Sequence, residues 1–397
     1  WQRCSLIIIF KTIAHNIMKI LLIGEYSRLH NSLKEGLQKN GHKVTLLGSG
    51  DGFKNYPVDI KIDSFFFNLK SFKLVAKLID RLFKISLNEV EIYYKVNKIM
   101  SNLKAYDVVQ LINENAFRTL PSLEILLIKT LIKNNNKLFL LSCGVDYKSV
   151  EYSLNNKFRY SILTPYFENP NLKKSFRHIL KYNTKEYRKL HEFILKNTNG
   201  IISSDIDYHI PYIKEKKYLG LIPNPINIDK IKYIKIKSID KIKILHGINS
   251  KNYIKKGNVF FDKALKAIKN KYGNKVEIIS TIDLDYNEHI KSVKNCHILL
   301  DQVYAYDQGY NALEAMAIGK VVFTGAEKEW LELYNIKENS VAINAFPDHK
   351  KIIESLEWLI NNPSKIMEIS ANAREFIEKN HNYISIAKQY EKAWSKN

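Results

Sequence analysis

CHILLDQVYAYDQGYNALEAMAIGKVVFTG, residues 296–325, has the pattern strand, loop, helix, strand. The apolar runs at 297–300 and 321–323 are short and continuous, and the helical segment 310–318 ends at Gly319. Two buried strands joined by so short a crossover are typical of a parallel sheet whose two faces are both covered. The stretch therefore predicts an α/β protein built on a parallel sheet.

The polar side chains of this stretch follow the end of its first strand. Ligands of a parallel sheet lie outside the carboxyl ends of the strands. Free N–H groups at the start of helix 310–318 suit a phosphate or pyrophosphate, and Gly309 allows a ligand to approach the backbone. One turn along, Glu314 is placed to accept hydrogen bonds from vicinal sugar hydroxyls. Spacing alone also fits a solvated Glu314 and a helix-capping Asp301, so both interpretations stay open at this point.

The segment GYNALEAMAIGKVV, residues 309–322, resembles the donor site of the retaining GT-B glycosyltransferases of the family-four type, in which an E-x7-E motif runs into LEAMA-x-GxPV. The resemblance implies an α/β fold with two Rossmann-like, doubly wound parallel-sheet domains that face a cleft. It makes Glu314 the second glutamate, which holds the nucleotide ribose. The first glutamate falls at Tyr306, so Asp307 or Asp301 is the candidate for its place.

A second anion-binding arrangement follows the predicted strand 242–245, where Lys256 and Gly257 open a helix. The resemblance implies that an arginine and a lysine of this loop neutralise the donor pyrophosphate. Lys256 matches the lysine, whereas the arginine is absent and its candidate replacements are His246, Asn249 and Lys251. The predicted catalytic residues are Glu314, Asp307 and Lys256. The predicted donor-binding residues are His246, Asn249, Lys256, Asp301, Gln302, Gly309, Asn311, Ala312 and Glu314.

The first half of the chain shows the same alternation of strands and helices. Strand 18–24 leads through a loop without GxGxxG to a helix at 32–39, as in GT-B N-terminal domains. Buried strands at 106–112 and 137–142 end in polar residues, but no histidine follows them, so an acceptor-side catalytic histidine is not assigned. The predicted acceptor-binding residues are Ser27, His30, Asn31, Asn113, Glu114 and Asp146. Taken singly, the polar residues of the first loop are equally explained as helix caps.

The connection between the two halves is marked by Pro223 and Pro225, which fix an extended segment. We expect the hinge near 218–240, and loops at 327–333 and 344–348. The domains predicted are a non-native or mis-started extension at 1–17, an acceptor-binding domain at 18–220, a nucleotide-sugar-binding domain at 221–380, and a terminal helix at 381–397 that returns to the first domain.

Composition sets limits on the class of protein. The 397 residues suffice for two domains. The three cysteines, Cys4, Cys143 and Cys296, have no metal-ligand spacing and indicate a reducing cytoplasm. The net charge is +22, but 54 of the 62 basic residues are lysines and they are spread along the chain without a nucleic-acid-binding motif. The charge therefore favours pyrophosphate substrates and an anionic membrane surface over nucleic acid.

Residues 61–104 interleave apolar and lysine positions at helical spacing. Such a basic amphipathic region can rest on a membrane surface. It is also explained by a solvated face on a helix that packs against the sheet.

The function predicted is transfer of a sugar from a nucleotide-sugar to a saccharide or polyprenyl-linked acceptor in surface polysaccharide synthesis, in the cytoplasm or at the inner membrane face. Fixed positive groups stabilise the departing nucleoside diphosphate, so neither a metal nor another cofactor is expected. Retention of configuration is implied by the resemblance. One alternative is a GT-B nucleotide-sugar epimerase, which would act on the donor alone. Another is a charge-driven nucleic-acid-binding protein, whose affinity would fall steeply with salt.

Overall fold

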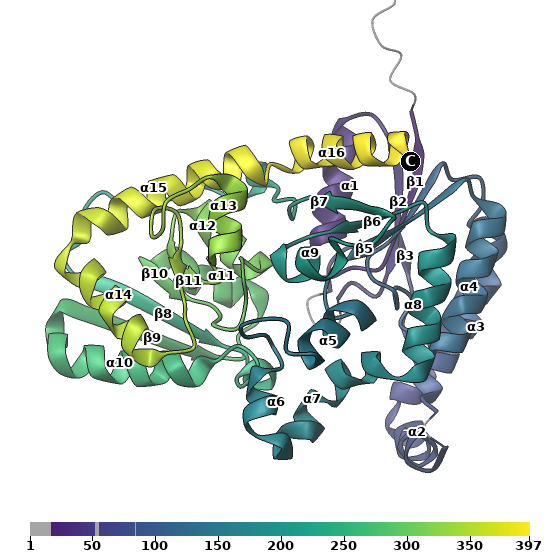
Figure 1. Ribbon diagram of the computed structural model, residues 1–397, viewed down its shortest axis with the longest axis horizontal. Coiled ribbons are helices and arrows are strands. Elements are labelled where there is room, and N and C mark those ends of the chain that lie inside the picture. The colour runs from purple at the N-terminus through teal and green to yellow at the C-terminus, as the bar shows by residue number, and fades with distance from the viewer. Residues whose placement is uncertain (1–16, 52–54, 84) are drawn as a thin grey trace, which may run out of the picture.

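The computed structural model describes residues 17–51, 55–83 and 85–397. Within them the chain forms two parallel sheets, each with helices on both faces, one in each half of the molecule (Figure 1). The predicted extension 1–17 and Cys4 lie outside the described residues, apart from residue 17. The prediction of an α/β protein with two parallel-sheet halves is confirmed.

The first sheet has seven strands in the order β3-β2-β1-β4-β5-β6-β7, and all its pairings are parallel. Its interior strand β1 begins with Lys19, and the four apolar residues that follow are completely buried, as expected for a strand covered on both faces. The strands are β1 (Lys19–Ile23), β2 (Lys43–Gly48), β3 (Ile60–Lys61), β4 (Val108–Leu111), β5 (Lys137–Ser142), β6 (Gly200–Ser203) and β7 (Tyr218–Leu221).

The second sheet has five strands in the order β12-β11-β10-β8-β9, again all parallel. The strands are β8 (Ile242–Ile248), β9 (Val276–Ile282), β10 (Ile298–Leu300), β11 (Val321–Thr324) and β12 (Ile343–Asn344). The carboxyl ends of the neighbouring strands β8, β10 and β11 therefore meet at one edge of this sheet.

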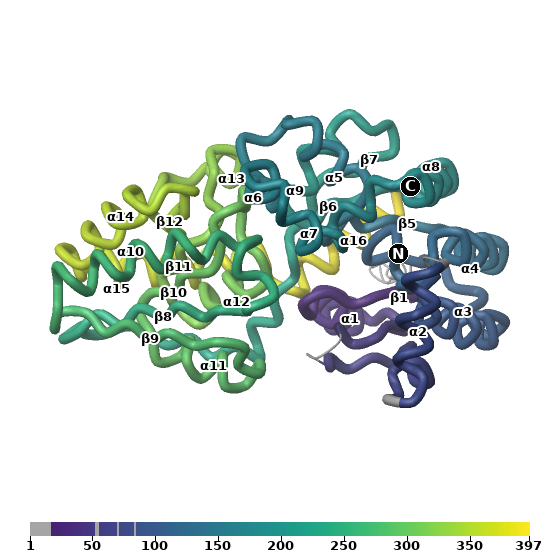
Figure 2. The backbone as a smooth tube through the Cα atoms, turned by 90° about the horizontal axis from the view of Figure 1, so that it is seen from below, coloured from purple at the N-terminus to yellow at the C-terminus, as the bar shows by residue number. Residues whose placement is uncertain are grey.

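Helices cover both sheets and connect successive strands (Figure 2). The helices of the first half are α1 (Leu29–Lys39), α2 (Lys70–Phe83), α3 (Leu87–Ile99), α4 (Pro121–Asn134), α5 (Tyr147–Leu154), α6 (Thr164–Glu168), α7 (Lys173–Leu180), α8 (Lys185–Asn197) and α9 (Ile206–Tyr212). Those of the second half are α10 (Asn258–Tyr272), α11 (Tyr286–Asn295), α12 (Tyr310–Ile318), α13 (Lys328–Tyr334), α14 (His349–Asn361), α15 (Pro363–Asn380) and α16 (Tyr383–Lys396).

The chain returns to the first sheet at its end, because α15 and α16 run along one side of the molecule from the second half to the first (Figure 1). Helix α16 contributes Ile386, Tyr390 and Trp394 to the core of the first sheet. The indole Nε1 of Trp394 donates to Oε1 of Gln110 on β4 at 3.2 Å. Helices α16 and α1 pack closely, and the contact rests on the missing side chain of Gly36.

Two segments differ from the expectation. The loop expected at 327–333 is largely helical and forms most of α13, because Trp330 is buried against Phe376 of α15 at 5.3 Å between ring centroids. Residues 218–221, expected as the start of the hinge, form β7 on the edge of the first sheet. We therefore propose that the connection between the domains starts after Leu221, and we keep the predicted domain division otherwise as a proposal.

In the part of the chain that the structure describes, no helix combines the length and the apolar composition that crossing a bilayer requires.

Candidate active site

The start of α12 lies at the edge where β8, β10 and β11 end. Asp301 follows β10 directly and is only 2% exposed. Its Oδ1 accepts hydrogen bonds from Nζ of Lys256 and from Nδ2 of Asn311, both at 2.8 Å. Three predicted donor-side residues are thus brought together, with Gly309 capping the helix beside them.

Lys256 reaches Asp301 because of the backbone at Gly257. That glycine has φ +69°, in the left-handed region, and a Cβ there would lie 2.8 Å from Cβ of Val303. The N–H of Val303 donates to the carbonyl of Lys256 at 2.9 Å. The β8–α10 loop is therefore held against the β10–α12 loop, and a side chain at position 257 would separate them.

Glu314 is buried rather than solvated, which rules out the solvated-helix interpretation left open by the sequence. Its Oε1 accepts a hydrogen bond from the hydroxyl of Tyr286 at 2.9 Å. Burial, followed by the charge of Glu314, raises the pKa of Tyr286, so the phenol keeps its proton and donates. The ring of Tyr286 packs edge-on against Tyr56 from the first half, at 6.2 Å between centroids. Glu314 thus lies where the two halves meet.

Arg28 was not among the predicted residues, although it belongs to the first loop. It has φ +73° and pairs with Glu35 at 2.9 Å. Burial favours its neutral form, but the charges of Glu35, Tyr310 and Glu314 outweigh burial and raise the pKa of Arg28. Arg28 is therefore a candidate for the arginine that the β8–α10 loop lacks. The sequence did offer a signal for Arg28: it lies in the loop after β1, and arginine is rare in this chain, with eight among 397 residues.

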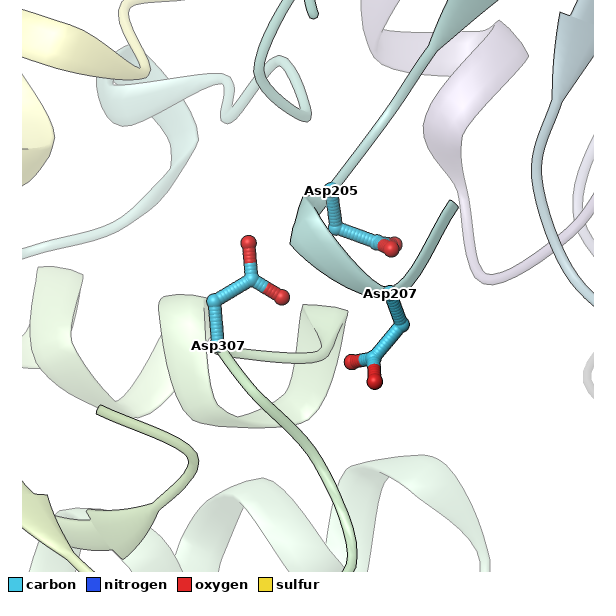
Figure 3. A group of neighbouring side chains, drawn as sticks. All are labelled: Asp205, Asp207 and Asp307. Atoms are coloured by element: carbon cyan, nitrogen blue, oxygen red, sulfur yellow. The ribbon is translucent and has the colours of Figure 1, made fainter. Parts of the chain in front are cut away.

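Three aspartates gather between the two halves, with Asp307 opposite Asp205 and Asp207 (Figure 3). Asp205 and Asp207 flank the start of α9, and Asp307 lies in the β10–α12 loop; ligand atoms of all three lie within 4.8 Å of one another. Oδ2 of Asp307 accepts from the N–H of Ile206 at 2.9 Å, and Oδ2 of Asp207 accepts from the N–H of Tyr306 at 3.1 Å. These bonds join α9 of the first half to the loop of the second.

Burial is the main cause of the altered protonation of these aspartates. It raises the pKa of Asp307 well above its ordinary value, and the charges of Asp205 and Asp207 raise it further. Burial likewise raises the pKa of Asp207 to about 7. Burial and the mutual repulsion of the three groups therefore favour protonated carboxyls, which can donate as well as accept hydrogen bonds. The group could also hold a cation; Asp205 and Asp207 were overlooked, although their Asp-x-Asp spacing is visible in the sequence.

A pocket of about 210 Å³ opens in front of this group. Residues of both halves line it: Val145, Ser149, Val150, Ser153, Phe158, Ser161, Ile162, Leu163, Ile179, Asp205, Asp207, Tyr208, Gln302, Tyr304, Ala305, Asp307 and Gly309. Three predicted residues, Gln302, Asp307 and Gly309, thus face one cavity. Tyr306 does not line it, since its hydroxyl accepts a hydrogen bond from the N–H of Arg159 at 2.9 Å and its ring packs on Phe158.

The remaining donor-side residues have structural partners. His246 is completely buried, its Nε2 donates to Oδ1 of Asn258 at 2.9 Å, and burial lowers the pKa of its imidazole, so it adds no positive charge. Asn249 caps a short turn by accepting from the N–H of Lys251. Ala312 is buried in α12.

The predicted acceptor-side residues of the first loop shape that loop. The N–H of Ser27 donates to Oδ2 of Asp51 at 2.9 Å. The buried ring of His30 bonds through Nδ1 to the carbonyl of Gly24, at 2.8 Å. The N–H and Nδ2 of Asn31 both donate to Oε2 of Glu25, at 2.8 and 2.6 Å.

The other three acceptor-side residues are also buried and engaged. Nδ2 of Asn113 donates to the carbonyls of Cys143 and Val145, and Asp146 caps α5. Glu114 lies 3.0 Å from Nδ1 of His191 on α8, and burial raises the pKa of Glu114 to about 7. A histidine therefore does stand beside these strand ends, although it comes from a helix 77 residues further along the chain.

The fold and this edge geometry define a class of protein. Residues 260–392 match the family described as glycosyl transferase-like. The two parallel-sheet halves, together with the solved structures that resemble the chain, confirm the predicted GT-B fold, and the family match lies in the second half of the chain.

Solved structures that resemble the chain over nearly its whole length support the fold assignment. HepE of Anabaena, solved in complex with UDP and glucose, is 12% identical, with a TM-score of 0.56 over 96% of this chain and 100% of that one. Sucrose-phosphate synthase of Thermosynechococcus elongatus is 13% identical, with a TM-score of 0.55 over 96% and 98%. A glycosyltransferase of Rickettsia africae is 15% identical, with a TM-score of 0.52 over 96% and 99%. None of the curated protein sequences matches the chain.

Proposed function

We propose that the protein transfers a glycosyl group from a nucleoside diphosphate sugar, first of all a UDP-sugar, to a saccharide or lipid-linked saccharide. The observation that carries the proposal is the alignment of Gly309, Lys256 and Glu314 along one sheet edge, next to a pocket that both halves line. UDP is the first candidate because HepE was solved with UDP and glucose.

Each part of the donor has a matching group at this edge. The pyrophosphate lies at the N-terminus of α12, where free N–H groups and Lys256 neutralise it. The ribose hydroxyls donate to Glu314, whose other bond, from Tyr286, fixes the carboxylate. The glycosyl group enters the pocket of about 210 Å³ beside Asp307. Burial raises the pKa of Asp307 well above its ordinary value and so favours the protonated carboxyl, which can donate to a sugar hydroxyl.

The chemistry requires stabilisation of the leaving group. As the bond from the anomeric carbon to the phosphate oxygen breaks, negative charge grows on the nucleoside diphosphate. Lys256, the helix N-terminus and Arg28 are fixed before the reaction begins, so they stabilise that charge without reorganising. Retention at the anomeric carbon remains an expectation from the family resemblance.

The test starts with a panel of nucleoside diphosphates measured by thermal shift, in which UDP is expected to stabilise the protein most. A ligand at about a hundred times its dissociation constant adds roughly 2.7 kcal/mol to the free energy of unfolding. Glu314→Gln should weaken UDP binding about tenfold or more, since it removes a charged acceptor. The matched control is Glu332→Gln on the exposed side of α13. Equal affinity of Glu314→Gln and the wild type would remove Glu314 from the site.

A second candidate function, nucleotide-sugar epimerisation, is favoured by the three aspartates, since shared protons suit acid–base chemistry. Incubation with donor alone separates the two functions. Rapid isomerisation without an acceptor would favour the epimerase, and turnover that needs a saccharide would favour transfer.

We place the reaction in the cytoplasm at the inner face of a membrane, as one step of surface polysaccharide synthesis. The charge of +22 supports an anionic surface as partner. Binding of duplex DNA with a steep salt dependence, without binding of UDP, would instead support the nucleic-acid alternative.

A further inference from the structure

The apolar side chains that face solvent are concentrated in one short part of the chain. Of the 21 large apolar side chains that are exposed among the described residues, ten lie between positions 65 and 94. Isolated exposed leucines are ordinary, but a contiguous set marks a binding surface. Helix α2 and the short 3₁₀ turn before it, residues 66–68, carry most of this set.

Helix α2 has an apolar stripe that no other part of the described chain covers. Leu74, Leu78 and Leu82 are spaced four residues apart, so they lie on one side of the helix, and they are 75%, 57% and 65% exposed. The protein-facing side of the helix is marked by Ala76, which is buried. The helix lies at the outer end of the first half, away from the second sheet (Figures 1 and 2).

A row of basic side chains runs beside this stripe. Lys73, Lys77 and Arg81 each precede one of the leucines, which places them about 100° around the helix from the apolar stripe. Asp80, the acidic residue of α2, is half-buried. A strip of leucines bordered by lysine and arginine fits the boundary between acyl chains and anionic headgroups, because the long basic side chains reach the phosphates while the leucines enter the apolar layer.

The turn before α2 links this surface to a second pocket. Phe65 and Phe66 are more than half exposed. Their N–H groups both donate to Oε1 of Glu91 on α3, at 2.7 and 3.2 Å, so Glu91 connects the turn to α3. Ser64 and Asn68, which precede and follow the two phenylalanines in the sequence, line a pocket of about 200 Å³.

The second pocket lies at the end of β1 and has both polar and apolar side chains in its lining. Besides Ser64 and Asn68 it is lined by Glu25, Asp63, Asn88 and Arg118. Glu25 is buried, its Oε1 has no hydrogen-bond partner among the described residues, and burial raises its pKa to about 8. A polar ligand group in this pocket would contact residues that are sequence neighbours of the exposed Phe65 and Phe66.

We propose that Phe65, Phe66, Leu74, Leu78 and Leu82, with the basic row Lys73, Lys77 and Arg81, form a docking surface for an anionic lipid bilayer. The surface, which we call the α2 face, holds the second pocket next to the bilayer, so an acceptor with a lipid anchor can place its saccharide there. This consequence for the acceptor rests on the proposed function. Docking itself requires only the α2 face.

Charge argues against a second copy of the chain as the occupant. Pairing two α2 faces would bring two basic rows together on chains that each carry a net charge of +22. An anionic bilayer supplies an apolar layer for the leucines and phenylalanines of the α2 face, and negative charge for its basic row.

The test is flotation of the full chain with lipid vesicles. The wild type should bind vesicles of phosphatidylcholine with phosphatidylglycerol at least tenfold more strongly than vesicles of phosphatidylcholine alone, and high salt should weaken that binding. Leu74→Ser with Leu78→Ser should reduce binding at least tenfold. The matched control, Leu126→Ser with Leu333→Ser, replaces exposed leucines elsewhere and should bind as the wild type does.

A second variant pair tests the charge. Lys73→Gln, Lys77→Gln and Arg81→Gln together should lose the preference for anionic vesicles, whereas the charge-matched control Lys263→Gln, Lys266→Gln and Lys388→Gln should keep it. Vesicle binding that is absent in the wild type, or equal in the α2 variants and their controls, would overturn the proposal. So would self-association of the wild type that the leucine variants abolish, since a second copy would then cover the α2 face.

Thermal shift with UDP keeps this proposal separate from the proposed function. All α2 variants should retain the wild-type response to UDP, which also shows that they fold. If the wild type binds vesicles but no nucleoside diphosphate, the docking surface stands and the transferase proposal fails. If it binds UDP but no vesicles, the transferase proposal stands and the docking surface fails.

Discussion

Replacement of Lys256 by methionine should affect both stability and donor binding. Methionine keeps the apolar stem and removes the charge, so Oδ1 of Asp301, which is 2% exposed, retains only its bond from Asn311. Removing one partner of a fully buried ion pair costs about 3–5 kcal/mol. The side chain of Lys256 is 30% exposed, so solvent screens the pair and we expect a loss of about 1–3 kcal/mol in the free energy of unfolding.

The same variant should bind nucleoside diphosphates more weakly. A hydrogen bond to a charged group contributes about 1.5–3 kcal/mol, which corresponds to roughly a ten- to hundredfold higher dissociation constant for UDP. Stability is measured by urea denaturation and UDP binding by calorimetry. Lys266→Met on the exposed side of α10 is the control for loss of a positive charge.

The double variant Lys256→Met with Asp301→Asn separates the two effects. Asparagine at 301 removes the unpaired buried charge, so most of the lost stability should return. UDP binding should stay weak, because the positive charge at the pyrophosphate is still missing. If the double variant binds UDP as tightly as the wild type does, Lys256 does not contact the donor, and its role is limited to pairing with Asp301.

Two further predictions concern stability. Burial raises the pKa of Asp207 to about 7 in the folded protein, above about 4 for an unfolded aspartate, so the folded state binds an extra proton between these values. The contribution of Asp207 to stability therefore falls as the pH rises from about 4 to 7, by up to about 1.4 kcal/mol per pH unit. In urea denaturation, Asp207→Asn should become more stable relative to the wild type as the pH is raised from 5 to 8. An equal difference between the two proteins at both pH values would contradict this. Gly36→Ala would place a Cβ 2.2 Å from the carbonyl oxygen of Tyr383, so it should lower the free energy of unfolding by about 1–3 kcal/mol. In Gly309→Ala the new Cβ would lie 3.5 Å from the nearest side-chain atom of Gln302, so this control should be as stable as the wild type. Equal denaturation midpoints for the two alanine variants would refute the close α1–α16 packing.

Much of the sheet edge where β8, β10 and β11 end could be predicted, because it depends on the order of strands, loops and helices along the chain. The helix predicted at 310–318 coincides with α12, and the apolar runs before and after it are β10 and β11. In a parallel sheet, residues that directly follow adjacent strands must lie at the same edge. Lys256 and Asp301 are 45 residues apart, and this rule alone brings them to the same edge.

The contacts across the two halves could not be predicted in this way. Asp205 and Asp307 are about a hundred positions apart and belong to different sheets, so their distance depends on how the halves pack. The same holds for His191 beside Glu114, since a helix face brings it there. Helix α13 was missed for a related reason: a seven-residue segment has little helical preference of its own, and Trp330 stabilises it only by packing on α15.

The sequence by itself determined the two parallel sheets and the order of strand, loop and helix around α12. Apolar runs and helical spacing are properties of neighbouring residues. Once the strands pair in a parallel sheet, the residues that follow adjacent strands lie at the same edge of that sheet. Only the tertiary structure decided that Glu314 is buried under Tyr286, that Arg28 stands beside it, and that three aspartates share one pocket. Burial and charge at those sites come from side chains that are distant in the chain, and no local pattern records which of them will meet.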